Sequence, residues 1–126
     1  MINQVGQIML YVNNQEKALQ FWTEKAGFHV IAEESLSPEM KWYEIAATPD
    51  AETSLVLQDK QVVAKMSPGV NLGTPSLMLF TPNIDQLYQD FKDKEITVGE
   101  LVDLPFGRVF NFADDEDNYF AVMERK

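Results

Sequence analysis

The chain has 126 residues, of which 45% are hydrophobic, and a formal net charge of −10 at pH 7. That length fits one compact domain, and no apolar run approaches the roughly 20 residues that a membrane-spanning helix needs. The charge argues against binding to nucleic acid, because a protein that binds the phosphate backbone needs a basic face. Cysteine is absent, which excludes disulfides and thiol catalysis. With no signal-like start, we expect a cytoplasmic protein without a membrane partner.

The first half of the chain predicts a strand, a helix and three further strands. Residues 7–12 alternate between two faces, as a half-buried strand does. Asn14 is placed to cap a helix over residues 15–25, and Gly27 is placed to end it. The other elements predicted in this half are a strand at 28–32, a loop at 35–39 and strands at 42–46 and 54–58.

The second half repeats the first at an offset of 69 residues. Residues 76–83 carry the same alternation as residues 7–14, and Asn83 takes the capping place of Asn14. Agreement over strand, cap and helix indicates a duplicated βαβββ module. The predicted elements are a strand at 76–80, a helix at 84–94 and strands at 96–100, 108–112 and 119–124. The modules span about 1–60 and 74–126, joined by a connector at 61–73 with glycine and proline.

Each predicted sheet has one helix, which covers one of its two faces. The positions that face the helices are apolar: Ile8, Leu10, Val12, Leu55, Leu57, Leu77, Leu79, Phe120 and Val122. The opposite positions form a concave surface: Gln7, Met9, Tyr11, Ser54, Val56, Gln58, Ser76, Met78, Phe80, Ala121 and Met123. An ordinary half-buried sheet places charged residues on its outer face. This largely apolar surface therefore predicts either packing on another sheet or contact with an apolar ligand.

Four consecutive acidic residues, 114–117, precede Asn118 between the last two predicted strands. A calcium-binding loop of the EF-hand type needs a glycine at its sixth position and a bidentate glutamate at its twelfth, and this segment has neither. We therefore expect a solvated turn.

In its order of elements and its duplication, the chain resembles the vicinal oxygen chelate superfamily, which includes glyoxalases, extradiol dioxygenases, fosfomycin-resistance enzymes and bleomycin-binding proteins. The resemblance covers the whole length. It rests on residues 7–12 before a helix, Lys25-Ala26-Gly27-Phe28, Lys41-Trp42, residues 53–57, Pro105-Phe106-Gly107-Arg108 and the hairpin ending in Asn118. It implies a single glyoxalase-like domain over residues 1–126, with the α+β fold of two paired βαβββ modules in an open eight-stranded barrel. It also implies a homodimer.

The family hairpin usually reads Asp-Pro-Asp-Gly-Asn, and here Asp115 and Asp117 stand where its proline and glycine would be. Aspartate tolerates a left-handed backbone better than most residues, so we expect the turn to survive.

The resemblance also implies a divalent metal held by one side chain from each of the first, fourth, fifth and eighth strands, typically His or Gln, then Glu, His and Glu. The corresponding residues here are Gln7, Val56, Ser76 and Ala121. Only Gln7 is a useful ligand, because serine is a poor neutral ligand and the other two have no donor atom. We therefore expect neither a metal nor any other cofactor.

No other residues rebuild a catalytic site. His29 is the only histidine and has no neighbours at ligand spacing. Tyr11 and Tyr43 are candidate acids without a base beside them in the sequence. Glu44 is a candidate base for metal-free proton transfer, but the sequence leaves open which face of its strand it occupies. Catalytic residues therefore stay unassigned.

Three functions remain open: a small-molecule binding protein, a lyase or dioxygenase acting on a small metabolite, and a protein-interaction module with a closed cavity. We favour metal-free binding of a small hydrophobic or cationic aromatic molecule, with the role in drug or toxin resistance that the bleomycin-binding branch implies. The expected ligand-binding residues are Gln7, Met9, Tyr11, Trp42, Val56, Gln58, Ser76, Met78, Phe80, Phe106, Asn111, Ala121 and Met123. For any one of these aromatic residues, the alternative is an ordinary core position.

Overall fold

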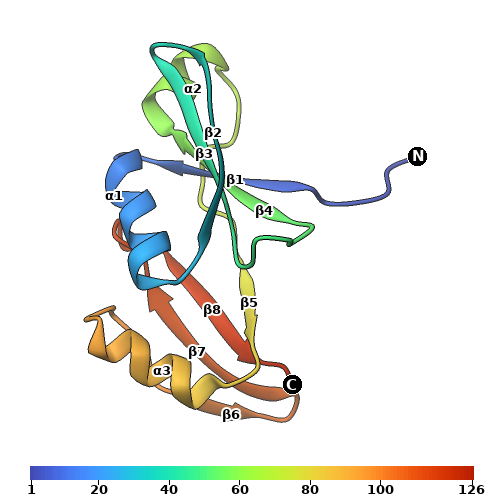
Figure 1. Ribbon diagram of the computed structural model, residues 1–126, viewed down its shortest axis with the longest axis vertical. Helices are drawn as coiled ribbons and strands as arrows, with labels where there is room; N and C mark the ends of the chain where they lie inside the picture. The colour runs from blue at the N-terminus through green and yellow to red at the C-terminus, as the bar shows by residue number, and fades with distance from the viewer. The chain divides into compact units, whose positions relative to one another are not determined.

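The computed structural model describes all residues, Met1–Lys126, and divides into two compact units, Met1–Thr74 and Pro75–Lys126. Each unit is built on a four-stranded mixed sheet with a helix against one face (Figure 1). The predicted α+β fold class with two βαβββ modules is therefore confirmed. None of the helices is long and apolar enough to cross a bilayer.

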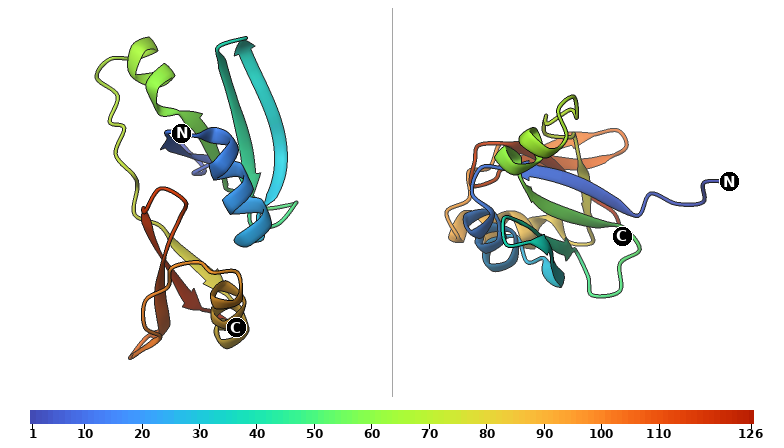
Figure 2. Two further views of the ribbon diagram at one scale, coloured as in Figure 1. Left: turned by 90° about the vertical axis from the view of Figure 1, so that its left-hand side faces the viewer. Right: turned by 90° about the horizontal axis from the view of Figure 1, so that it is seen from above.

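The first unit has the strand order β1-β4-β3-β2, in which β1 runs parallel to β4 and the other neighbours are antiparallel. Its elements are β1 (Gln7–Val12), α1 (Gln15–Gln20), the π-helical turn η1 (Phe21–Lys25), β2 (His29–Ser37), β3 (Met40–Ala46), β4 (Ser54–Asp59) and α2 (Lys60–Met66). Figure 2 shows β2 and β3 as a long hairpin beside α1.

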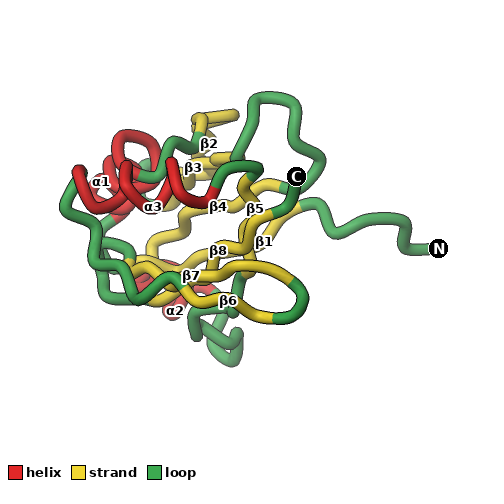
Figure 3. Tube along the Cα trace, turned by 90° about the horizontal axis from the view of Figure 1, so that it is seen from below, coloured by secondary structure: helices red, strands yellow, loops and turns green.

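The second unit repeats this topology with the strand order β5-β8-β7-β6, and β5 runs parallel to β8. Its elements are β5 (Met78–Thr81), α3 (Ile84–Asp93), β6 (Val102–Leu104), β7 (Gly107–Ala113) and β8 (Tyr119–Glu124). Figure 3 distinguishes the helices from the strands by colour.

The helix ends follow the sequence signals. The side chain of Asn14 accepts a hydrogen bond from the backbone N–H of Lys17 at 3.0 Å, and that of Asn83 accepts one from Gln86 at 3.1 Å. Gly27 has a φ of +82°, the left-handed conformation that favours glycine after a helix. Both predicted N-caps and the predicted glycine stop are confirmed.

Each unit buries its helix against the apolar face of its sheet. In the first, Trp22 is fully buried and meets the ring of Phe28 edge-on at 5.0 Å. In the second, Phe91 of α3 lies 5.8 Å from Phe110 and 5.2 Å from Phe112, both on β7. Burial of these rings supplies the main driving force for folding each unit.

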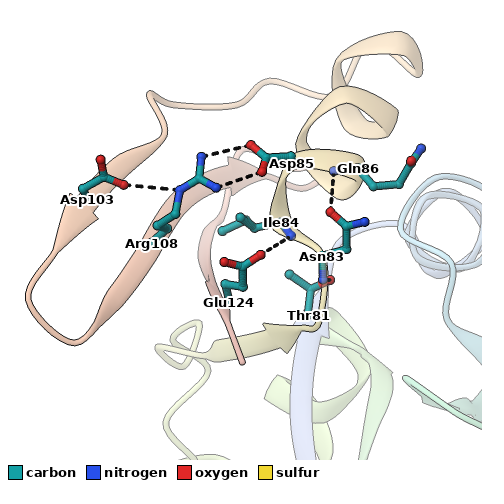
Figure 4. A network of polar contacts seen from close by, with 8 residues as sticks. All are labelled: Thr81, Asn83, Ile84, Asp85, Gln86, Asp103, Arg108 and Glu124. Carbon is teal, nitrogen blue, oxygen red and sulfur yellow. Dashed lines mark hydrogen bonds and ion pairs between the residues drawn. The ribbon is translucent and has the colours of Figure 1, made fainter. Parts of the chain in front are cut away.

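Polar contacts fix the start of α3 against its own sheet (Figure 4). Glu124 of β8 accepts a hydrogen bond from the backbone N–H of Ile84 at 3.1 Å. The guanidinium of Arg108 donates to both carboxylate oxygens of Asp85, at 2.8 and 2.9 Å, and lies 3.3 Å from Asp103. These hydrogen bonds from Arg108 lower the pKa of Asp85. Glu124 thus satisfies one N–H group at the start of α3, and the Arg108–Asp85 pair ties the first turn of the helix to β7.

The predicted acidic turn before Asn118 is built around one aspartate. The Asp114 carboxylate accepts backbone hydrogen bonds from Glu116 and Asn118, each at 2.9 Å. Asp117 has a φ of +62°, so it adopts the left-handed backbone at the position where the family has glycine. The expectation that aspartate sustains this turn is confirmed.

Two predictions in the first unit need correction. The single helix expected over 15–25 ends as an α-helix at Gln20 and continues as η1, where the N–H of Ala26 bonds to the carbonyl of Phe21. The loop expected at 35–39 is shorter, because β2 continues to Ser37 before a tight turn into β3. Three-residue periodicity does not distinguish a π turn from an α-helical one.

The connector and the sixth strand were also predicted wrongly. The connector contains α2, whose first N–H groups bond to the side chain of Asp59. The strand expected at 96–100 is reduced to one bridge between Val98 and Phe112. The strand that pairs with β7 is instead Val102–Leu104, joined to it by the turn through Pro105. Pro105 and Phe106 therefore form the turn of the β6–β7 hairpin.

Replacing Leu10 by alanine tests the assignment of the two sheet faces. Leu10 is 3% exposed and lies on the helix side of β1, whereas its neighbour Met9 is half-buried on the other side. We expect Leu10→Ala to lower the free energy of unfolding by about 2–5 kcal/mol. Met9→Ala should cost clearly less, since Met9 keeps part of its contact with solvent. Denaturant melts that give equal losses would contradict this assignment.

Candidate functional site

The strand register of the first unit defines the sheet face that lies opposite α1. Residues paired across neighbouring strands share a face, and α1 lies on the opposite face, which carries Leu10 and Tyr43. We call the face opposite α1 the first helix-free face. Its cross-strand rows are Tyr11–Gln58–Trp42–Glu34, Met9–Val56–Glu44–Ala32 and Gln7–Ser54.

Three polar side chains meet at one corner of this face. The hydroxyl of Ser54 donates to Glu44 Oε2 at 2.6 Å, and the side-chain amide of Gln7 donates to the same oxygen at 3.3 Å. Ser54 is buried and Glu44 is half-buried. The two donors come from β1 and β4, so the carboxylate on β3 is held across three strands. Hydrogen bonds to an ionised acceptor are stronger than neutral ones and fix its orientation.

The rest of the first helix-free face is apolar. Met9, Tyr11 and Trp42 are half-buried, and Val56 between them is buried. The amide of Gln58 lies 3.8 Å from the sulfur of Met9. Two aromatic rings and a flexible thioether offer flat, adaptable surface to a small molecule. This face thus combines an apolar surface with one oriented carboxylate.

The second unit has its own helix-free face. Its register places Met78, Ala121 and Asn111 in one row, and Phe80, Met123, Val109 and Val102 in the next. Met78 is 44% and Phe80 60% exposed, and the guanidinium of Arg125 lies 4.7 Å from the ring centre of Phe80. β7 begins at Gly107, which lies close to Met123. A Cβ atom at this position would lie 3.3 Å from the Met123 side chain, which is a tight contact. This face is therefore also apolar, with an exposed aromatic ring.

Most residues predicted to bind a ligand lie on these two faces. Gln7, Met9, Tyr11, Trp42, Val56 and Gln58 lie on the first, and Met78, Phe80, Asn111, Ala121 and Met123 lie on the second. Ser76 precedes β5, and Phe106 lies exposed in the turn between β6 and β7.

Tyr43 does not belong to the first helix-free face. Its hydroxyl donates to Glu16 of α1 at 2.6 Å, and Lys41 lies 3.1 Å from the same carboxylate oxygen. The hydrogen bonds from Tyr43 and Lys41 lower the pKa of Glu16, and the hydrogen bond to the Glu16 carboxylate raises the pKa of Tyr43. Tyr43 is buried and occupied in linking the helix to β3, so it is a poor candidate for the acid considered from the sequence.

The residues at the metal positions of the family do not fit a metal. Val56 and Ala121 have no donor atom, and Gln7 donates its side-chain amide to Glu44. No group of three or more His, Cys, Asp or Glu side chains in the chain is arranged to hold an ion. His29 is exposed and pairs in register with Ala46. No chemical step through a bound metal is therefore derived for this chain.

Of the three polar side chains that meet on the first helix-free face, the sequence analysis did not include Glu44 and Ser54 among the expected ligand-binding residues. The register of β3 pairs Glu44 with Val56, which settles the phase that the sequence left open. In the segment from Trp42 to Ile45, both sets of alternate residues include a large apolar side chain, so alternation alone did not decide which set faces the helix. Ser54 was assigned to the concave surface but not to the ligand site, because serine is common on strands and its partner was unknown.

Comparisons with known proteins agree with this architecture. The sequence pattern of the family described as "Glyoxalase/Bleomycin resistance protein/Dioxygenase superfamily" matches residues 4–122. The uncharacterized protein YetH of Bacillus subtilis strain 168 is 34% identical over 125 residues, which is 98% of this chain and 100% of that protein.

Solved structures extend the comparison. TnmS3, an antibiotic-binding protein from Streptomyces sp. CB03234, is 27% identical with a TM-score of 0.83, covering 99% of this chain and 98% of that one. A member of the glyoxalase/bleomycin resistance protein/dioxygenase superfamily from Sphaerobacter thermophilus DSM 20745 is 26% identical with a TM-score of 0.82, covering 98% of each chain.

The donor set at the four family metal positions predicts weak metal binding. After incubation with Zn²⁺, Ni²⁺, Fe²⁺ or Mn²⁺ and desalting, we expect far less than one ion per chain by elemental analysis, because one amide oxygen cannot hold a divalent ion against water. About one tightly held ion per chain would contradict this.

Proposed function

The chain belongs to the Glyoxalase/Bleomycin resistance protein/Dioxygenase superfamily, and on that premise we propose that it binds a small planar molecule on its first helix-free face without a metal ion. The ligand is a hydrophobic or cationic aromatic compound, and the role is protection against a drug or toxin. We extend the proposal to a cytoplasmic homodimer, and we propose separately that the second helix-free face, on its own unit, also offers an apolar binding surface.

The observation that carries the proposal is the composition of the first helix-free face. Trp42 and Tyr11 occupy the same cross-strand row, with Gln58 between them. Two strand spacings separate the backbones of these residues, which is about 10 Å and close to the width of a fused-ring compound. Rigid aromatic side chains lose little conformational entropy when they bind a flat ligand. The few polar groups nearby supply orientation, as in most small-molecule sites.

The relatives support a binding role. TnmS3, which has 27% sequence identity to this chain, is described as an antibiotic-binding protein. The alternative of a lyase or dioxygenase finds no support in the donor set, because Val56 and Ala121 replace carboxylates that the metal-dependent members use. The alternative of an interaction module predicts that small aromatic molecules do not bind.

Tryptophan fluorescence tests the proposed site. We expect daunorubicin, a planar fused-ring antibiotic with one amine, to quench Trp42 when titrated into a Trp22→Phe background, where Trp42 is the remaining tryptophan. Trp42→Ala should weaken binding by about 1–3 kcal/mol, the loss expected for one stacking contact. Binding of this variant is followed by calorimetry.

Trp22 provides the control. It is fully buried on the helix side of the sheet, so contact with a ligand on the first helix-free face should leave it unchanged. If quenching persists in Trp42→Phe and disappears in Trp22→Phe, the ligand binds elsewhere. If no planar compound quenches either residue, the binding proposal is wrong.

A further inference from the structure

We propose that Glu44 is the specificity-determining residue of this face, and that its carboxylate pairs with a protonated amine carried by the planar ligand. This inference rests on the proposed function and narrows its ligand class to cationic aromatic amines. It assigns to Glu44 a direct electrostatic contact with the ligand and no catalytic step.

The hydrogen bonds around Glu44 prepare it for such a contact. Its two donors, the Ser54 hydroxyl at 2.6 Å and the Gln7 amide at 3.3 Å, both reach the same oxygen, Oε2. Oε1 is therefore left for a further donor, which the ligand would supply. Because the two donors come from rigid neighbouring strands, the carboxylate is oriented before the ligand arrives, and little entropy is lost on binding.

The first helix-free face has no cation of its own opposite Glu44. Lys41 is the only lysine or arginine in the four strands of this unit, and it points with Tyr43 toward Glu16, 3.1 Å away. The register places a second carboxylate, Glu34, on the same face beside Trp42. His29 pairs with Ala46 at the end of the sheet. A half-buried carboxylate without a cationic partner is stabilised by a ligand that brings one.

The spacing along β3 matches the shape of such a ligand. Glu44 and Trp42 are two residues apart on one strand, so their side chains leave the same face about 7 Å apart. A ring system stacked on Trp42 would thus place a substituent amine, one or two bonds from the ring edge, within reach of Glu44. Val56, the cross-strand partner of Glu44, is buried and apolar, so it does not compete for the amine.

Matched ligands separate this inference from the proposed function. Daunorubicin carries a protonated amine, whereas N-acetyl-daunorubicin has the same ring system and no charge. We expect the full chain to bind the amine more tightly than the acetylated compound by about 10- to 100-fold, the range of one charge-assisted hydrogen bond. In Glu44→Gln that preference should disappear, with Trp42 still quenched by both compounds.

Glu33→Gln is the matched control. It removes the same charge from the neighbouring strand, but Glu33 pairs with Tyr43 and so lies on the opposite face. Affinity for the amine should change by about twofold or less, because exposed charges at a distance are screened by salt. Circular dichroism checks that each variant is folded; Gln at position 44 can still accept the hydrogen bond from Ser54.

Each remaining outcome counts against one proposal or both. Equal affinity for the two compounds, or a preference that survives Glu44→Gln, overturns the role of Glu44 and leaves the binding proposal standing. If the preference is lost in Glu34→Gln but kept in Glu44→Gln, Glu34 and not Glu44 makes the contact, and the inference is wrong. If neither compound binds to the unmodified protein, both proposals fail.

Discussion

The alternation of side chains along paired strands is the constraint on which each unit depends. A four-stranded sheet has two faces, and in each unit a helix, α1 or α3, packs on one of them. Leu10, Leu57 and Ile45 are therefore buried on the side of α1. The residues that alternate with them point to the opposite face, on which α1 does not pack. A one-residue shift of register would exchange the two sets completely. The core thus determines which residues are offered to a ligand.

The energetic character of the first helix-free face follows from that separation. The core of the unit is formed on the helix side, so the other side is free to keep groups that do not maximise stability. A half-buried carboxylate held by Ser54 and Gln7 is such a group. Burying a carboxylate costs free energy unless its oxygens are hydrogen-bonded, and the proposed cationic ligand would supply the remaining partner. Glu44 would then add affinity by pairing with the amine of the proposed ligand.

The duplicated elements and the two faces could be predicted from the sequence, because strand alternation, asparagine caps and Gly27 are local signals. What could not be predicted depended on pairing between distant residues. The phase of Glu44 is set by Val56 on another strand, and the sixth strand is set by which residues oppose β7. The helix α2 is only seven residues long and begins at an aspartate cap inside a segment that lacks periodicity. Short elements carry too few residues for a pattern to appear.

Methyl NMR of the six methionines provides the most direct test of ligand contact with the first helix-free face. A planar ligand shifts nearby methyl groups through its ring current. With labelled methionine methyls and daunorubicin, we predict a large shift for Met9, which lies on that face, and none for Met66, which lies at the end of α2, outside the strands that form the face. Shifts of Met78 and Met123 would report engagement of the second helix-free face. A bound state in which Met66 shifts and Met9 does not would contradict the account.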